Sequence, residues 1–194
     1  MKTKMTFLLL LPVALAVFWF ASNSRAATET PEYKVIRSDE KFEIRDYPAL
    51  SLATSPMAAD GMNGGFGNLF RFITGTNEAK EKIEMTSPVL ISNTTEKKTM
   101  SFIMPQATVS KGVPKPAGDA VSLTSLPATR FAVLRFPGGR NAENEKNAIA
   151  ALRAWLTAQK FVAKGEPLFA YYDPPWTLIP FRRNEVMIRI DKDS

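Results

Sequence analysis

The side chains best suited to chemistry gather near the end of the chain, in the stretch YYDPPWTLIPFRRNEVMIRI of residues 171–190. There Tyr172 comes shortly before two prolines, and Arg182 and Arg183 come shortly before Glu185. A carboxylate beside arginines often forms an ion pair, whereas a carboxylate near a phenol can transfer protons in catalysis. The stretch is therefore interpreted first as a structural turn at the rim of a cleft. The alternative is a Tyr/Glu-dependent hydrolytic or oxidative site.

Two absences restrict the chemistry of the whole chain. The sequence contains no Cys and no His. This excludes disulfides, thiolate nucleophiles, zinc–thiolate sites, and the Ser-His-Asp and Cys-His schemes in their usual forms. The side chains that remain for general acid–base catalysis are Lys, Asp, Glu and Tyr. We therefore expect a binding protein rather than an enzyme, with no catalytic residues and no metal site of its own.

The N-terminal residues have the pattern of an export signal. Lys2 and Lys4 precede the apolar run FLLLLPVALAVFWFA of residues 7–21, and Ser24 and Ala26 stand where a small-residue cleavage site needs them. The run is shorter than the roughly 20 apolar residues of a spanning helix. We expect residues 1–26 to be removed, with an uncleaved anchor as the alternative. One exported, periplasmic domain of residues 27–194 would remain.

The net charge gives little support to a nucleic-acid partner. The formal charge of +6 falls to about +3 when the three basic residues of the leader are set aside, and the chain has no long run of like charges. We expect no nucleic acid, and membrane contact only through a retained leader. The oligomeric state is left open.

Period-two alternation and turn signals predict the strands that would position these side chains. The expected strands are residues 33–38, 42–47, 49–55, 85–92, 99–105, 120–126, 129–136, 168–172 and 185–190. The element order strand, strand, helix, strand, strand is expected twice, over residues 33–105 and 120–190. The interpretation is an α+β fold, a distorted antiparallel eight-stranded barrel from two ββαββ halves, flanked by two helices. A plain α+β sandwich is the alternative.

The two expected helices have different apolar faces. The face of the first is Phe66, Leu69, Phe70 and Ile73, while Phe72 lies off it and is expected to be the more exposed aromatic. Asn141 is expected to cap the second helix. The face of the second helix is Ala148, Ile149, Leu152, Trp155 and Leu156. In the loop before the last strand, Trp176 and Phe181 are expected to pin the turn to the body.

Four segments carry a resemblance to a known family. They are FEIRDYPAL of residues 42–50, KIEMTSPV of residues 82–89, MSFIMP of residues 100–105 and YDPPWTLIPFRRNEVMI of residues 172–188. Their order and spacing resemble the E-x-R-x-Y, M-T-x-P-V, F-x-x-P and Y-D/N-P-P…R-R-N-E-V motifs of the SOUL haem-binding family. The resemblance covers nearly all of the chain after the leader. It implies the same repeated barrel and non-covalent binding of haem or a related tetrapyrrole.

The resemblance also implies where the ligand would lie. A groove along the first helix matches Met62, Phe66, Leu69, Phe70 and Ile73. Arg71 and Arg182 could hold the propionates. The axial His proposed for some family members cannot be carried over, because this chain has none. A Met or Tyr could take that place, or the site could hold the ring by its faces and propionates alone. Gyrase-inhibitor-like domains share the broad architecture and bind varied small molecules, so the alternative is an apolar or cationic ligand in an interior cleft with Glu185 and Tyr172 as polar contacts.

Overall fold

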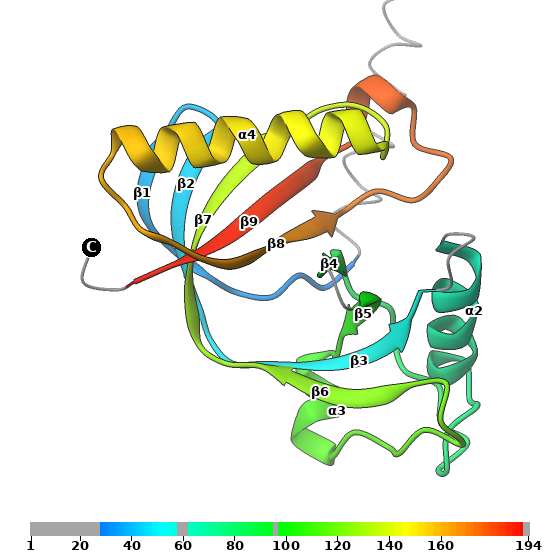
Figure 1. Ribbon diagram of the computed structural model, residues 1–194. Helices are drawn as coiled ribbons and strands as arrows, with labels where there is room; N and C mark the ends of the chain where they lie inside the picture. Colours follow the sequence, from blue (N-terminus) through cyan, green and yellow to red (C-terminus); the bar gives the residue numbers. More distant parts are fainter. Residues whose placement is uncertain (1–27, 58–61, 95–96, 192–194) are drawn as a thin grey trace, which may run out of the picture.

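A computed structural model describes residues 28–57, 62–94 and 97–191 of the chain (Figure 1). The expected leader of residues 1–26 lies outside these described residues. Within them, no helix is both long enough and apolar enough to cross a membrane.

The described residues form one antiparallel sheet of nine strands. The strands are β1 (Lys34–Asp39), β2 (Phe42–Tyr47), β3 (Leu50–Pro56), β4 (Val89–Asn93), β5 (Lys98–Ile103), β6 (Ser122–Leu126), β7 (Thr129–Phe136), β8 (Ala163–Tyr171) and β9 (Asn184–Ile190). Their order in the sheet is β1-β2-β7-β9-β8-β4-β5-β3-β6. The α+β class is confirmed. The closed eight-stranded barrel is not, because the described sheet has nine strands and stays open between β1 and β6.

The strand order has the twofold pattern of a repeated unit once β1 is set aside. Read from one end, the sheet is β2-β7-β9-β8, and read from the other it is β6-β3-β5-β4. Each half thus contributes one strand to the edge of the other, and β4 pairs with β8 where the halves meet. Only two residues separate β2 from β3, and only two separate β6 from β7, so each of these strand pairs forms one bent ribbon. The two ribbons pair with each other in both halves of the sheet, β2 with β7 and β3 with β6.

The long helix of the second half is placed as the sequence predicts. Helix α4 (Ala142–Ala158) covers the half-sheet that contains β7, β8 and β9 (Figure 1). Asn141 caps it, because its side chain accepts a hydrogen bond of 2.9 Å from the backbone N–H of Asn144. The expected apolar face is confirmed, with three side chains buried and two partly buried.

The helix of the first half is rotated from its predicted orientation. In α2 (Met62–Ile73), Leu69, Phe72 and Ile73 are buried, whereas Phe66 and Phe70 are 39% and 47% exposed. The expectation that Phe72 is the exposed aromatic is wrong. A Cβ at Gly65 would lie 3.3 Å from the carbonyl oxygen of Pro56, so the helix approaches β3 at this glycine. Because of that approach, the side of the helix that carries residues 65, 69 and 72 faces the sheet.

The sheet has two buried faces. On the outer one, Val186, Ile188 and Ile190 of β9 join the larger core cluster under the helices. On the inner one, Met187 joins a smaller cluster with Tyr47, Phe131 and other apolar side chains of both halves. Glu185 alternates in step with Met187, so it belongs to this inner face. Two short elements, α3 (Gln106–Lys111) and the 3₁₀ turn η1 (Ile179–Phe181), complete the fold.

Candidate ligand sites

A buried charge cluster lies on the inner face of the sheet. The carboxylate of Glu185 accepts hydrogen bonds of 2.8 and 3.1 Å from the two terminal nitrogens of Arg45. Arg183 donates to the same carboxylate at 2.6 and 3.0 Å, and the hydroxyl of Tyr172 donates at 2.8 Å. The side chain of Glu185 has no solvent exposure, and that of Arg45 is 4% exposed. We call Glu43, Arg45, Tyr172, Arg183 and Glu185 the Glu185 network.

Two sequence motifs supply this network from distant parts of the chain. Alternation along β2 places Glu43, Arg45 and Tyr47 on one face, and Arg45 reaches both of its neighbours, at 2.6 Å to the Glu43 carboxylate and 3.2 Å to the Tyr47 hydroxyl. Strand β7 pairs with both β2 and β9, which brings Arg45 and Glu185 together across it. The network therefore unites the E-x-R-x-Y segment with the C-terminal segment.

The turn after β8 fixes the remaining arginine. The carboxylate of Asp173 accepts a hydrogen bond from the backbone N–H of Arg183. The Arg183 guanidinium then lies 3.9 Å from the centre of the Tyr172 ring. The prediction that Glu185 pairs with a neighbouring arginine is confirmed for Arg183. Arg182 instead donates to the carbonyl oxygens of Pro175 and Thr177, so it holds the loop together.

The electrostatics of the network oppose proton transfer at neutral pH. Burial by itself would raise the pKa of Glu185, but the hydrogen bonds and charges of Arg45 and Arg183 outweigh it and hold that pKa below its ordinary value. Burial and the charge of Glu185 raise the pKa of Tyr172, and burial raises that of Tyr47 to about 12. A general base or acid works best with a pKa near the operating pH. The pKa of Glu185 is lowered away from that range, and the pKa of Tyr172 is raised away from it.

A polar cavity of about 260 Å³ opens beside the network. Its wall contains Glu185, together with Tyr33, Glu40, Lys41, Glu43, Arg45, Arg135 and Arg183. A second cavity of about 360 Å³ lies at β3 and β6, against Leu52, Met104 and Leu123 among others. Neither of these two cavities is lined by α2. A cationic ligand in the first would have to displace Arg45 or Arg183 from Glu185.

An aromatic surface lies on α2 instead. The rings of Phe66 and Phe70 stack with centroids 6.0 Å apart and planes tilted by 15°. Phe66 also packs edge-on against Phe102 of β5. On the adjoining side of the helix, Arg71 is exposed and donates to Asn68 at 2.6 Å. We call Phe66, Phe70 and Arg71 the α2 ledge.

The ledge is narrower than the groove that the sequence predicts. Leu69 and Ile73 are 0% and 4% exposed and pack into the core, so they offer no surface to a ligand. The side chain of Met62 lies outside the described residues. Of the groove residues named from sequence, the structure therefore brings Phe66 and Phe70 together at the surface beside Arg71.

The family model of the SOUL heme-binding protein matches residues 28–189. The chain belongs to the SOUL family. The match spans all described strands except the last residue of β9, so it includes both the α2 ledge and the Glu185 network. None of the curated proteins compared with the chain matches it.

Solved structures resemble this SOUL chain in fold at low sequence identity. An uncharacterized conserved protein from Listeria innocua is 10% identical, with a TM-score of 0.58, covering 79% of this chain and 93% of that one. A hydrolase encoded by lin2189 from the same organism is 9% identical, with a TM-score of 0.57 and coverages of 80% and 94%. The EcmrR C-terminal domain is 12% identical, with a TM-score of 0.53 and coverages of 82% and 98%. At these identities the likeness establishes the fold alone.

Sequence reasoning missed Arg45 and Glu43 as site residues of the SOUL domain. Their signal was present, because charged residues at 43 and 45 alternate with Phe42 and Ile44 in a strand. That alternation puts the charges together on one face. What the pattern could not reveal is that β7 would place this face opposite Glu185.

Proposed function

We propose that this SOUL domain binds haem or a related tetrapyrrole non-covalently, with the flat ring against the α2 ledge. The observation that carries the proposal is the pair of stacked, exposed phenylalanines on α2 in a chain of a haem-binding family. Large exposed apolar patches commonly mark binding surfaces. Exposed aromatic side chains suit a planar ligand because a porphyrin ring can stack on the open face of an aromatic ring.

The apolar contact would supply a large part of the binding free energy without a bond to iron. Covering about 200 Å² of apolar surface on the ring and the ledge would contribute about 5 kcal/mol. Arg71 adds a charge for a propionate at the edge of the ring. Its present partner Asn68 is neutral and their hydrogen bond is exposed, so the guanidinium can turn to an anion at little cost.

The donor chemistry of the described chain does not favour a strong axial ligand. The sequence has no His. Burial raises the pKa of Tyr171 and of Tyr172, which keeps both phenols protonated at neutral pH and unsuited to bind ferric iron. The ring would therefore be held by its face and its propionates. When bound, the haem iron would supply the redox and ligand chemistry that the chain itself lacks.

Parallel titrations with ferric haem and iron-free protoporphyrin test this binding mode. The proposal predicts saturable one-to-one binding of both, with dissociation constants within about threefold of each other, because the iron makes no strong bond. Absence of binding at tens of micromolar would remove the proposal. Haem binding more than about tenfold tighter than protoporphyrin binding would show that the chain ligates the iron.

A second candidate ligand site is the cavity beside the Glu185 network. Its volume of about 260 Å³ and the buried carboxylate in its wall favour a small polar ligand. Because two arginines already neutralise Glu185, a lipophilic cation is a poor fit to this arrangement. Titration with tetraphenylphosphonium, a lipophilic cation, tests whether this cavity accepts a cationic ligand. Saturable binding that Glu185→Gln abolishes would support the cationic form of this candidate, and no binding would remove it.

We also propose that residues 1–26 direct export and are removed afterwards. The positive residues, the apolar run of residues 7–21 and the small residues Ser24 and Ala26 support this reading. The mass of the protein recovered from outside the inner membrane of an expressing bacterium tests it. A chain beginning at Ala27 is the expected result, and a chain that keeps the leader would indicate an anchor.

A further inference from the structure

The turn between β8 and β9 carries an unusual concentration of exposed apolar side chains. Within residues 174–181, Trp176 is 82% exposed, and Leu178, Ile179 and Phe181 are each more than half exposed. The expectation that Trp176 pins this turn to the body is therefore wrong. We call residues 174–181 the Trp176 loop. Figure 1 shows it, with η1, projecting beyond the ends of β8 and β9 at the edge of the molecule.

The Trp176 loop is held in shape by contacts within itself and at its base. The backbone N–H of Thr177 donates to Pro174, that of Phe181 to Leu178 and that of Arg182 to Ile179. Arg182 closes the loop by donating to the carbonyl oxygens of Thr177 and Pro175. These hydrogen bonds therefore fix the turn in a shape that leaves its apolar side chains exposed to solvent.

The same features suit the loop to a medium of low polarity. Pro174, Pro175 and Pro180 have no backbone N–H, so the loop has three fewer donors to satisfy away from water. Trp and Phe prefer the boundary between lipid headgroups and acyl chains, and Leu and Ile prefer the acyl region. Arg182 follows directly after the loop and has backbone carbonyls, not a carboxylate, as its hydrogen-bond acceptors. A basic residue at this place favours an anionic membrane surface.

Glu29, close to where the leader joins the domain, lies on the same side of the domain as the Trp176 loop, so a leader that is still attached would hold this side toward the membrane. The backbone N–H of Ser87 donates to the carbonyl oxygen of Glu29, and the Ser87 hydroxyl donates to that of Tyr172. A single residue, Ser87, therefore contacts both Glu29 and Tyr172, and Tyr172 lies at the base of the Trp176 loop. The apolar run of residues 7–21 is joined to this point by seven residues, which reach at most about 25 Å.

We propose that the Trp176 loop inserts into the interface of a lipid bilayer and holds the domain against the membrane. Its occupant is the lipid surface itself, with the four apolar side chains among the acyl chains and headgroups and Arg182 at the level of the phosphates. The contact does not depend on tetrapyrrole binding. It also does not require the leader to be retained, because the loop belongs to the folded domain.

Trp176 provides a direct probe of this insertion. The chain is used in the form recovered from expressing cells, with Trp19→Phe where the leader is present. The difference in fluorescence between this protein and the same protein with Trp176→Phe isolates the emission of Trp176. With vesicles of phosphatidylcholine and phosphatidylglycerol, we expect that emission to move to shorter wavelength. Lipids brominated on the acyl chain should quench it, because the indole would lie at the boundary of the acyl region.

Two variants separate insertion from a general affinity for vesicles. Replacing Leu178 and Ile179 together by Ser should abolish the wavelength shift of Trp176. Val162 is 60% exposed and lies elsewhere on the surface, so Val162→Ser is the matched control and should leave the shift unchanged. Equal far-ultraviolet circular dichroism of all variants checks that each is folded.

Other occupants of the loop give different results. If Trp176 stays open to aqueous iodide in the presence of vesicles, the membrane proposal is overturned. If haem changes the emission of Trp176 and vesicles do not, the loop belongs to the tetrapyrrole site and not to a membrane contact. If a photocrosslinker at position 176 captures a single protein in cells while vesicles have no effect, the loop is a protein interface, which also overturns the proposal.

Discussion

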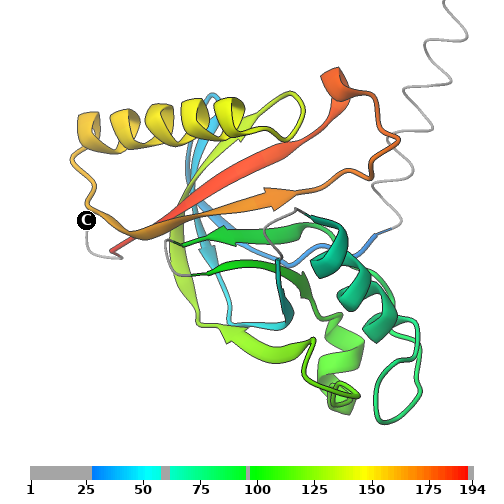
Figure 2. The same ribbon diagram turned by 45° about the vertical axis from the view of Figure 1, so that its right-hand side comes forward.

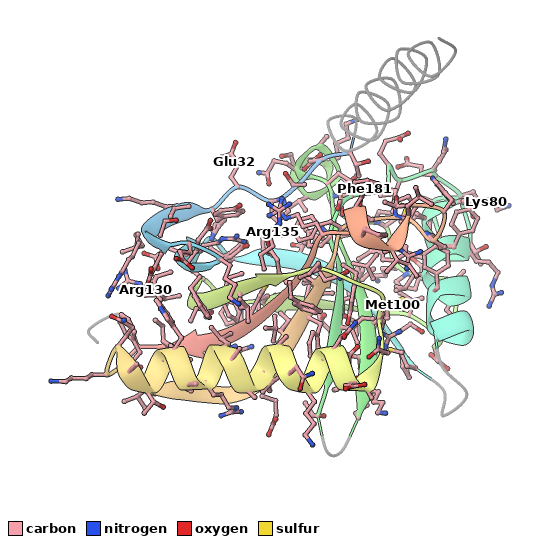
Figure 3. All side chains as sticks on the ribbon, turned by 90° about the horizontal axis from the view of Figure 1, so that it is seen from above. Glu32, Lys80, Met100, Arg130, Arg135 and Phe181 are labelled. Carbon is pink, nitrogen blue, oxygen red and sulfur yellow. The ribbon has the colours of Figure 1, made fainter. Side chains whose placement is uncertain are left out.

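At the residue scale, the Glu185 network is the clearest example of what sequence can and cannot predict. The neighbourhood of Glu185 and Arg183 in the sequence was enough to predict their ion pair. The more deeply buried partner, Arg45, lies 140 residues away along the chain. Its contact depends on the pairing of β2 with β7 and of β7 with β9, which no local pattern specifies. Arg135, labelled in Figure 3, also lines the cavity beside the network.

Replacing Glu185 by Gln should reduce stability strongly. The change leaves Arg45 charged and buried without its counter-ion, and removing one partner of such a pair typically costs about 3–5 kcal/mol. Urea unfolding followed by circular dichroism measures the loss. Glu166→Gln, at an exposed position of β8, is the control and should change the free energy of unfolding by less than about 0.5 kcal/mol. A similar small change for Glu185→Gln would show that the network adds no stability.

The pH dependence of stability should reveal the same carboxylate. The pKa of Glu185 is lower in the folded chain than its ordinary value of 4.5. Its contribution is therefore complete above that value and is lost as the pH falls through the folded pKa. We expect the stability difference between the wild type and Glu185→Gln to be constant from pH 7 to about 5.5 and to shrink toward pH 3. A difference that grows on acidification would contradict the assigned charge state.

At the element scale, α4 followed its sequence pattern and α2 did not. The cap and the apolar face of α4 are local features and were predicted correctly. The face of α2 was predicted from spacing alone, which treats positions 66 and 70 as equivalent to 69 and 73. The structure separates them because Gly65 lets one side of the helix approach β3. The side that remains exposed carries the two stacked phenylalanines of the ledge.

The cap of α4 gives a simple test of the local assignment. Asn141→Ala removes the acceptor of the Asn144 N–H and should lower the free energy of unfolding by about 1 kcal/mol. Asn147 is exposed in the middle of the same helix, and Asn147→Ala should be neutral or slightly stabilising because Ala has the higher helix propensity. Thermal unfolding of the pair compares them directly. Equal midpoints would mean that Asn141 does not cap the helix.

At the scale of the whole molecule, the repeated halves are joined by long-range pairing. Figure 2 shows the two half-sheets meeting along β4 and β8, with α4 over one and α2 at the far end of the other. Element order along the sequence predicted the repeat. The expected strand at residues 33–38 is present as β1. The open sheet was not predicted, because closure of a sheet into a barrel depends on twist and register. The inner face between the halves buries the smaller apolar cluster and the Glu185 network.

This arrangement predicts one cooperative unfolding transition. The bent ribbons β2–β3 and β6–β7 each run through both halves of the sheet, so neither half keeps its core when the other unfolds. Trp155 fluorescence reports on the second half, and the methyl resonance of Met100, labelled in Figure 3, reports on the first. Their urea midpoints should coincide. Two separated midpoints would show that the halves are independent folding units.

The central claim is that a tetrapyrrole lies on the α2 ledge, and the most direct test compares two matched surface changes. Replacing Phe66 and Phe70 together by Ser removes the exposed aromatic pair, whereas Ile36→Ser with Val162→Ser removes two exposed apolar side chains elsewhere. The affinity of each folded variant for ferric haem is measured from the Soret band. We predict that the first variant binds at least about tenfold more weakly than the wild type, a loss of about 1.4 kcal/mol or more, and that the second binds equally well. Equal affinity of all three proteins would contradict the account.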